Sequence, residues 1–182
     1  MSRVSKEIIN LKELKKYSLE DNYFIAEGKL GINKVLVPTF LKLNIDEEHK
    51  TMKVTLVDVN ECQHIPMNGT IVRLIKNAII GVVEGFYKVF LFKGLGYKYS
   101  LNGKQLTMQL GYSHPVYSII PDNISAIAEK PERLKITSIS KADLGLYAHK
   151  LKTYRKWNPY SGKGIIEEFE IPQVKEVVKN KK

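Results

Sequence analysis

The first half of the chain contains short stretches in which apolar and polar residues alternate. Between residues 51 and 59, apolar Met52, Val54 and Leu56 alternate with polar residues. A period of two places successive side chains on opposite faces, so this stretch is predicted to be a half-buried β-strand. Two shorter strand candidates lie at residues 23–26 and 35–37.

The period then changes from that of a strand to that of a helix. Apolar side chains recur at helical spacing at Ile71, Ile75, Ala78, Ile79 and Val82. This spacing gathers them on one face of a helix, which we predict over residues 70–83. Asn68 or Thr70 is suited to cap the start of this helix, and Gly85 is suited to follow its end.

The second half repeats this order of strands followed by a helix. Strand candidates lie at residues 86–92, 97–101, 104–110 and 134–139. Asn102-Gly103 separates two of them and predicts a tight hairpin, because both residues tolerate the positive φ of a type I′ turn. Ser140 and Asp143 form a capping-box pattern, and apolar residues at helical spacing then predict a second helix over 141–156.

Together these patterns predict an α+β protein built by internal duplication. Each half is expected to form one domain, at residues 1–84 and 85–166, and a charged extension follows at 167–182. Sequence identity between the two halves is slight, so the duplication is inferred from the order of elements and not from matching residues.

The net charge of the chain indicates which classes of partner it is suited to bind. Of 182 residues, 29 are Lys or Arg and 19 are Asp or Glu, which gives a net charge of +10. This surplus favours a polyanion, with nucleic acid first and an acidic membrane surface second, over an unspecialised basic protein. No apolar run approaches the roughly 20 residues that span a bilayer, and the N-terminus lacks a secretory signal. We therefore expect no membrane partner and a protein that works where it is made.

Motifs for catalysis, metals and cofactors are weak or incomplete. Cys62 is the single cysteine and forms a lone Cys-x-His with His64, whereas a zinc site needs about four ligands. Gly94 and Gly96 precede a further strand candidate, where a dinucleotide fingerprint requires a helix. The four histidines are scattered, without a partner in a nucleophile–base arrangement. We expect no enzyme, no metal and no cofactor.

A basic stretch at residues 149–164 is the strongest functional feature. It contains no acid, its cations are Lys150, Lys152, Arg155, Lys156 and Lys163, and Tyr154, Trp157 and Tyr160 are interleaved with them. Cations neutralise phosphates, and rings or guanidinium planes stack on unpaired bases. The alternative is the solvated end of an amphipathic helix with an ordinary turn, in which Tyr154 packs in the core. The interleaved aromatics and the charge of the whole chain favour nucleic acid.

Three segments occur in a familiar order: GLGYK at 94–98, LGYSHPV at 110–116 and NPYSGKGI at 158–165. The last resembles the Pro-Tyr-Lys-Gly-Lys-Gly signature of the ribosomal large-subunit protein six family, bacterial or organellar type. Met1-Ser2-Arg3-Val4 and Gly69-Thr70 also resemble that family. The resemblance covers most of residues 67–165 and is thin over 5–66.

The resemblance implies two similar domains, each a small, mainly antiparallel sheet with one packed helix. It also implies binding of large-subunit rRNA, mainly by the second domain, near the sarcin–ricin loop where translational GTPases dock. Neighbouring ribosomal proteins would be further partners, the GTPases would be affected only indirectly, and no homo-oligomer is expected. The residues expected at the rRNA are Tyr160, Gly162, Lys163 and Gly164, with Lys152, Arg155, Lys156 and Trp157 in support and Lys98 and His114 as further candidates.

Two positions depart from the family signature. Ser161 stands where the signature has Lys, and Trp157 stands where it has Pro or Ser. Loss of one cation should lower the salt dependence of binding by about one unit, and we expect Trp157 to compensate by stacking. With the Lys, Asn, Ile and Tyr bias, these departures favour a ribosome of the mitochondrial matrix, with the bacterial cytoplasm as the alternative. The rival function is a free-standing RNA- or DNA-binding module outside the ribosome.

Overall fold

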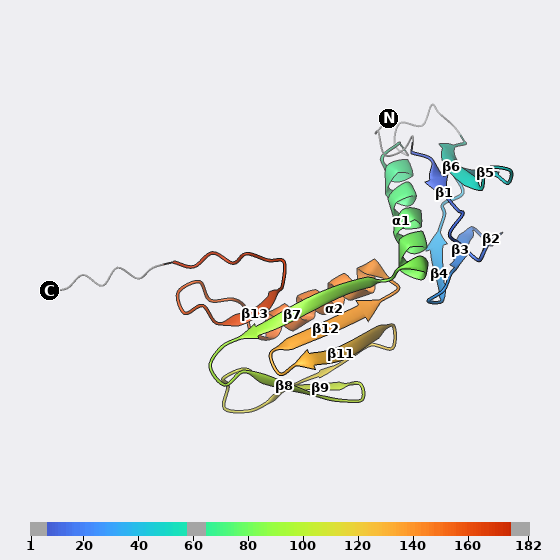
Figure 1. Cartoon of the computed structure of the whole chain (residues 1–182). Helices are drawn as coiled ribbons and strands as arrows, with labels where there is room; N and C mark the ends of the chain where they lie inside the picture. The colour runs from blue at the N-terminus through green and yellow to red at the C-terminus, as the bar shows by residue number, and fades with distance from the viewer. Residues whose placement is uncertain (1–6, 58–64, 176–182) are drawn as a thin grey trace. The chain divides into compact units, whose positions relative to one another are not determined.

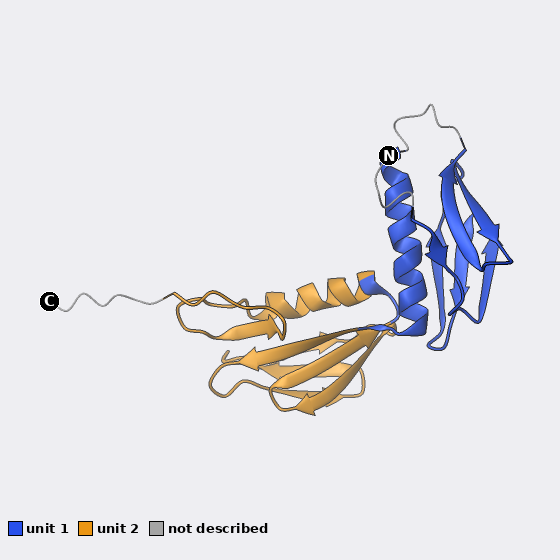
Figure 2. Ribbon diagram, turned by 45° about the horizontal axis from the view of Figure 1, so that its top comes forward, with its two compact units in different colours: residues 1–86, 139–141 blue, residues 87–138, 142–182 orange. Residues whose placement is uncertain are grey.

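The computed structural model describes residues 7–57 and 65–175, and it confirms the α+β fold (Figure 1). Figure 2 shows two compact units, one of residues 1–86 with 139–141 and one of residues 87–138 with 142–182. Each unit holds small antiparallel sheets and one helix. Whether the segments 1–84 and 85–166 fold as separate domains, with 167–182 as an extension, stays a prediction. Cys62 and His64 lie outside the described residues.

The described residues of unit 1 form six strands and one helix. They are β1 (Ile9–Asn10), β2 (Lys16–Glu20), β3 (Tyr23–Glu27), β4 (Ile32–Leu36), β5 (Leu41–Asp46), β6 (Thr51–Leu56) and α1 (Ile65–Val83). The strands form two antiparallel sheets, ordered β1-β6-β5 and β2-β3-β4. The core gathers Phe24 and Ala26 from β3, Met52 and Val54 from β6, and the apolar face of α1. Burial of these side chains supplies the main driving force for folding this unit.

The first helix begins five residues earlier than predicted, at Ile65 instead of residue 70. Pro66 lies in its first turn, where a missing backbone N–H costs nothing, so a proline is compatible with the start of a helix. Asn68 is consequently a buried residue inside the helix and not its cap. The predicted C-terminal glycine is confirmed: Gly85 has φ +77°, and its N–H donates to the Ile80 carbonyl at 3.1 Å.

In unit 2, the part of the chain that the structure describes forms seven strands and one helix. They are β7 (Phe86–Lys93), β8 (Lys98–Asn102), β9 (Gln105–Gln109), β10 (Val116–Ile119), β11 (Ile124–Lys130), β12 (Arg133–Ser138), α2 (Lys141–Tyr154) and β13 (Gly164–Glu167). The sheets are ordered β10-β9-β8 and β11-β12-β7-β13. Helix α2 buries Leu144, Tyr147, Ala148 and Leu151, and it ends at Tyr154, two residues before the predicted end.

The hairpin predicted around Asn102-Gly103 is present, but its turn differs. Asn102 pairs with Gln105, so the two loop residues are Gly103 and Lys104. Of these two, only Gly103 is left-handed, with φ +60°. A glycine at the first loop position is the arrangement of a type II′ turn, so the predicted type I′ turn is wrong.

Neither helix in the described part of the chain is long and apolar enough to cross a membrane.

Candidate nucleic-acid interface

The basic stretch after α2 folds into a tight loop. The Asn158 N–H donates to the Lys163 carbonyl at 2.9 Å, and the Gly162 N–H donates to the Asn158 carbonyl at 2.9 Å. The side-chain oxygen of Asn158 accepts from the N–H of Tyr160 at 2.9 Å, as in an Asx-turn. Gly162 has φ +63°, a conformation that glycine adopts without strain. The loop 158–163 is therefore fixed by its own hydrogen bonds.

Strand β13 ties this loop to the large sheet of unit 2. Gly164 pairs with Lys93 at the start of an antiparallel ladder between β13 and β7. The N–H of Ile165 donates to the Arg155 carbonyl at 3.0 Å, which closes the base of the loop. Gly164 is buried, and a Cβ on it would lie 2.7 Å from the Cα of Trp157. The chain therefore needs glycine here for internal packing.

Arg155, the first residue after α2, is held by two tyrosines from distant parts of unit 2. Its Nε donates to the Tyr97 hydroxyl at 3.1 Å, and its guanidinium lies 4.6 Å from the centre of the Tyr112 ring. Hydrogen bonding to the hydroxyls of Tyr112 and Tyr97 raises the pKa of Arg155. Tyr112 in turn donates to the Tyr154 carbonyl at 3.0 Å.

Tyr97 is itself wedged in place. Its ring is buried, and a Cβ on Gly94 would lie 2.7 Å from that ring, while one on Gly111 would lie 3.2 Å away. The two glycines thus make room for the ring that fixes Arg155. This explains why the segments 94–98 and 110–116 combine glycine and tyrosine.

Tyr112 and the segment from the end of α2 to Lys163 line an open groove on unit 2, with a volume of about 530 Å³. Its charged lining residues are Arg155, Lys156 and Lys163, and its aromatic ones are Tyr112, Tyr154 and Trp157. Thr153, Asn158 and Ser161 complete the described lining, so all the described groove residues are neutral or basic. A concave surface with three cations, one exposed ring and two half-buried rings suits a polyanion that also carries flat groups.

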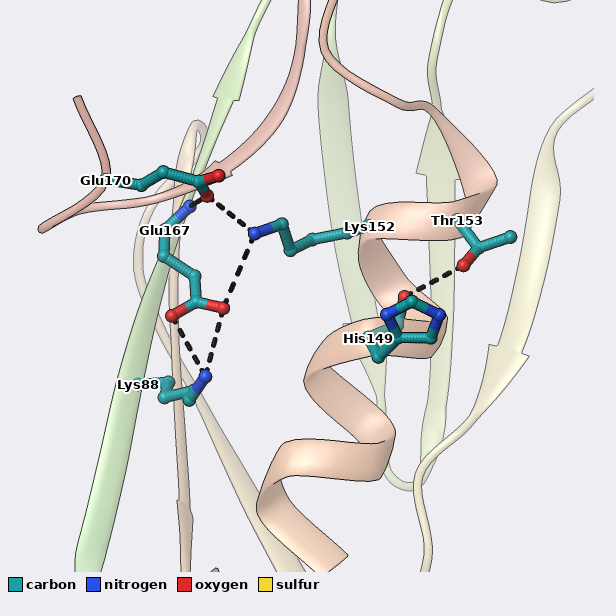
Figure 3. A network of polar contacts seen from close by, with 6 residues as sticks. All are labelled: Lys88, His149, Lys152, Thr153, Glu167 and Glu170. Atoms are coloured by element: carbon teal, nitrogen blue, oxygen red, sulfur yellow. Dashed lines mark hydrogen bonds and ion pairs between the residues drawn. The ribbon is translucent and has the colours of Figure 1, made fainter. Parts of the chain in front are cut away.

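Lys152 is engaged elsewhere. Its ammonium lies 2.6 Å from a carboxylate oxygen of Glu170 and 3.6 Å from one of Glu167, and Lys88 lies 2.9 Å from Glu167 (Figure 3). Figure 3 shows the Lys152 side chain reaching from α2 to these two carboxylates. Hydrogen bonding to Lys152 lowers the pKa of Glu170. This lysine therefore stabilises the fold of unit 2, and its charge is already largely compensated.

The remaining expected site residues lie in different settings. Tyr160 is 61% exposed at the tip of the loop, with the Lys175 ammonium 5.9 Å from its ring centre. His114 is exposed and stacks on Tyr112, with ring centres 6.3 Å apart. Lys98 is exposed at the start of β8, opposite Gln109. The structure thus brings Arg155, Lys156, Trp157 and Lys163 into one groove, with His114 against its Tyr112 side.

Sequence reasoning missed two residues of this groove region, Tyr112 and Tyr97. Both lie in the Gly–Tyr segments that carry the family resemblance, which was the available signal. Their contact with Arg155 joins residues more than 40 positions apart, and no local pattern predicts it.

Among residues 7–57 and 65–175, no group of three or more His, Cys, Asp or Glu side chains is placed to hold a metal ion.

Comparison with known proteins agrees with the resemblance. A family model described as ribosomal protein L6 matches residues 93–168. The large ribosomal subunit protein uL6 of Metamycoplasma arthritidis is 35% identical over 177 residues, which is 97% of each chain. The uL6 protein of Mycoplasma genitalium is 34% identical over 91% of this chain and 90% of its own. That of Stenotrophomonas maltophilia is 31% identical over 98% of this chain and 99% of its own. These relatives are bacterial, which gives no support to the expected mitochondrial assignment and favours the bacterial alternative.

Proposed function

The chain belongs to the ribosomal protein L6 family, and from this premise we propose that it is a structural constituent of the large ribosomal subunit. In this role it binds large-subunit rRNA near the sarcin–ricin loop and stabilises the folded RNA where translational GTPases dock. Its action is binding without a chemical reaction, and its influence on the GTPases is indirect. The compartment that fits its bacterial relatives is the bacterial cytoplasm.

The groove of unit 2 is the observation that carries this proposal. Arg155, Lys156 and Lys163 lie between α2 and β13 on a segment whose backbone is held by hydrogen bonds, so the backbone loses little conformational entropy when RNA binds. Lys156 and Lys163 are exposed, and no ion pair to either is found within the described residues. Each phosphate contact releases counterions, which makes the affinity depend steeply on salt. We therefore assign Lys156 and Lys163 to direct phosphate contacts.

The other expected residues take secondary places in this proposal. Tyr160 is exposed beside the groove and is suited to stacking, and Lys98 and His114 are suited to peripheral contacts. Gly162 and Gly164 shape the loop that presents the cations. Lys152 acts through its ion pairs with Glu167 and Glu170, which hold α2 against β13.

A second surface of unit 2 is suited to a neighbouring ribosomal protein. Phe169, Ile171 and Val174 are 80%, 95% and 66% exposed in the segment that follows β13. Apolar side chains gain little from phosphates but gain from burial against another protein.

The test is the affinity of the purified full chain for large-subunit rRNA, measured by filter binding at several salt concentrations. We expect a linear fall of log affinity with log salt, with a slope of several units, because several phosphates are contacted. Equal affinity for unrelated RNA and for duplex DNA would favour the free-standing binding module. Absence of RNA binding at low salt would reject the proposal.

A further inference from the structure

We propose that the groove of unit 2 receives an unpaired nucleotide of RNA, with its base against the surface formed by Tyr112, Arg155 and Trp157 and its phosphates on Lys156 and Lys163. The inference rests on the proposed function, since that function makes RNA the partner. It adds the form of RNA that this site takes: a single-stranded or bulged nucleotide, as opposed to the side of a double helix.

The planar groups of the groove are arranged before RNA arrives. The guanidinium of Arg155 lies 4.6 Å from the ring centre of Tyr112, and Tyr97 holds its Nε at 3.1 Å. His114 lies on the same ring as a near-parallel neighbour, at an interplanar angle of 21°. Bases stack on such rings and guanidinium planes when they are unpaired. Because Arg155 is already fixed, its planar group is not reordered on binding.

Phosphate binding alone does not explain this arrangement. A freely moving lysine on an open surface serves a phosphate as a point charge, whereas a guanidinium fixed between two tyrosines is a flat, directional group. Tyr97 is buried and is fitted against Gly94 and Gly111, so several residues are devoted to fixing one cation. The number of residues that hold this one guanidinium in place indicates a ligand that is itself flat.

The size and charge of the groove fit one nucleotide. Its volume of about 530 Å³ lies within the usual range for sites that enclose a small ligand, roughly 300–1,000 Å³. An A-form duplex hides its base faces inside the stack and exposes phosphates and groove edges. The described lining has cations and no carboxylate, so a nucleotide phosphate can lie beside Lys156 or Lys163 without repulsion.

Trp157 provides a direct readout, because it is the only tryptophan in the chain and it lines the groove. We would titrate the full chain with a short oligoribonucleotide of mixed sequence, either single-stranded or annealed to its complement, and follow tryptophan fluorescence. We expect the single strand to quench the fluorescence and to bind roughly tenfold more tightly than the duplex, because stacking of one base contributes on that scale.

Two sets of variants separate stacking from charge. Arg155→Lys keeps the charge and removes the plane, so the preference for single-stranded RNA over duplex RNA should fall roughly tenfold. Tyr112→Leu should remove the same preference, and Tyr112→Phe, which restores the ring, should recover it. The tyrosine pair keeps the test decisive if Arg155→Lys fails to fold, which thermal unfolding would reveal.

Each outcome has one meaning. Quenching by the single strand, lost in Tyr112→Leu and recovered in Tyr112→Phe, supports the inference. Equal binding of both RNA forms without quenching overturns it, and continued binding of large-subunit rRNA would then leave the proposed function standing. Loss of binding to every RNA contradicts both. Displacement of the single strand by oligoglutamate at equal concentration would also overturn the inference, because the groove would then bind polyanions through charge alone, without stacking on a base.

Discussion

The two units follow the same order of strands and helix, yet the chain leaves their helices in different ways. Helix α1 has 19 residues, buries eight of them and has no basic residue in its last turn. It is followed by Glu84 and Gly85, which lead directly into β7. Helix α2 has 14 residues, buries four, and is followed by Arg155, Lys156 and Trp157.

This difference between the two units indicates which part of the chain is specialised for binding RNA. The parts that the two units share bury apolar side chains, and such parts specify a fold without specifying a ligand. The loop between α2 and β13 has no counterpart after α1, and it contains all three cations of the described groove lining. A duplicated scaffold thus holds one specialised loop. Changes in that loop should alter RNA binding, and matched changes in unit 1 should alter stability alone.

The largest effect is expected from Gly164→Ala. The new Cβ would meet the Trp157 backbone at 2.7 Å at a φ of +149°, so the start of β13 has to shift. We expect a loss of about 3 kcal/mol in the free energy of unfolding, and loss of rRNA binding at temperatures where the variant is still folded. Urea unfolding and filter binding measure the two effects.

Gly28→Ala in unit 1 is the matched change. Its Cβ would meet the Val82 carbonyl oxygen at 2.4 Å, so a comparable loss of stability is expected. Its rRNA affinity should be unchanged while it is folded. Equal loss of binding in both variants would show that the loop after α2 is not the distinguishing feature.

The next effect is that of removing two groove cations together. Lys156→Ala with Lys163→Ala should lower the slope of log affinity against log salt by about two units, because each lysine neutralises about one phosphate. The unit 1 counterpart is Lys42→Ala with Lys53→Ala, two exposed lysines on β5 and β6. A salt slope that changes equally in the two double variants would argue for diffuse attraction over a defined groove.

A smaller gain is expected from Ser161→Lys, which adds a cation to the groove lining. Ser161 is exposed, so the added side chain needs no repacking. The salt slope should rise by about one unit. Thr70→Lys on the exposed side of α1 adds the same charge elsewhere and should leave the slope as it is. No difference between the two additions would remove Ser161 from the interface.

The smallest effect is that of Lys152→Ala, which should alter stability and not RNA binding. Lys152 lowers the pKa of Glu170, so this pair stabilises the fold when Glu170 is ionised, above roughly pH 4.3, the usual pKa of a free Glu. That contribution disappears as the pH falls through the lowered pKa. Because both side chains are partly exposed, we expect at most about 1 kcal/mol at neutral pH and no difference in strong acid.

Urea unfolding of the wild-type chain and of Lys152→Ala across this pH range checks the sign. A tenfold loss of rRNA affinity in Lys152→Ala would instead return this lysine to the RNA interface.

The periodicity of apolar residues predicted the fold class and both helices, because a long apolar helix face requires apolar residues at regular spacing over many positions. It predicted only some of the strands. Strands β10 and β13 have four residues each, and β13 exists because Ile165 and Ile166 pair with β7 more than 70 residues earlier. Such pairing is a tertiary effect, which overrides local propensity.

The site shows the same division between local and distant information. The cations of the groove lie close together in sequence, so Arg155, Lys156 and Lys163 were found from composition and order. The pairing of Lys152 with Glu170 was not predicted from the sequence. The residues around Lys152 do not indicate that the chain comes back to it 18 residues later. The fixing of Arg155 by Tyr97 and Tyr112 was hidden for the same reason.

Sedimentation tests membership of the large ribosomal subunit most directly. The full-length protein, tagged and expressed in its own cells, would be followed through a sucrose gradient before and after a high-salt wash. We predict that it travels with large subunits and stays with them through the wash, because it is built into the folded rRNA. Protein that remains at the top of the gradient would contradict the account.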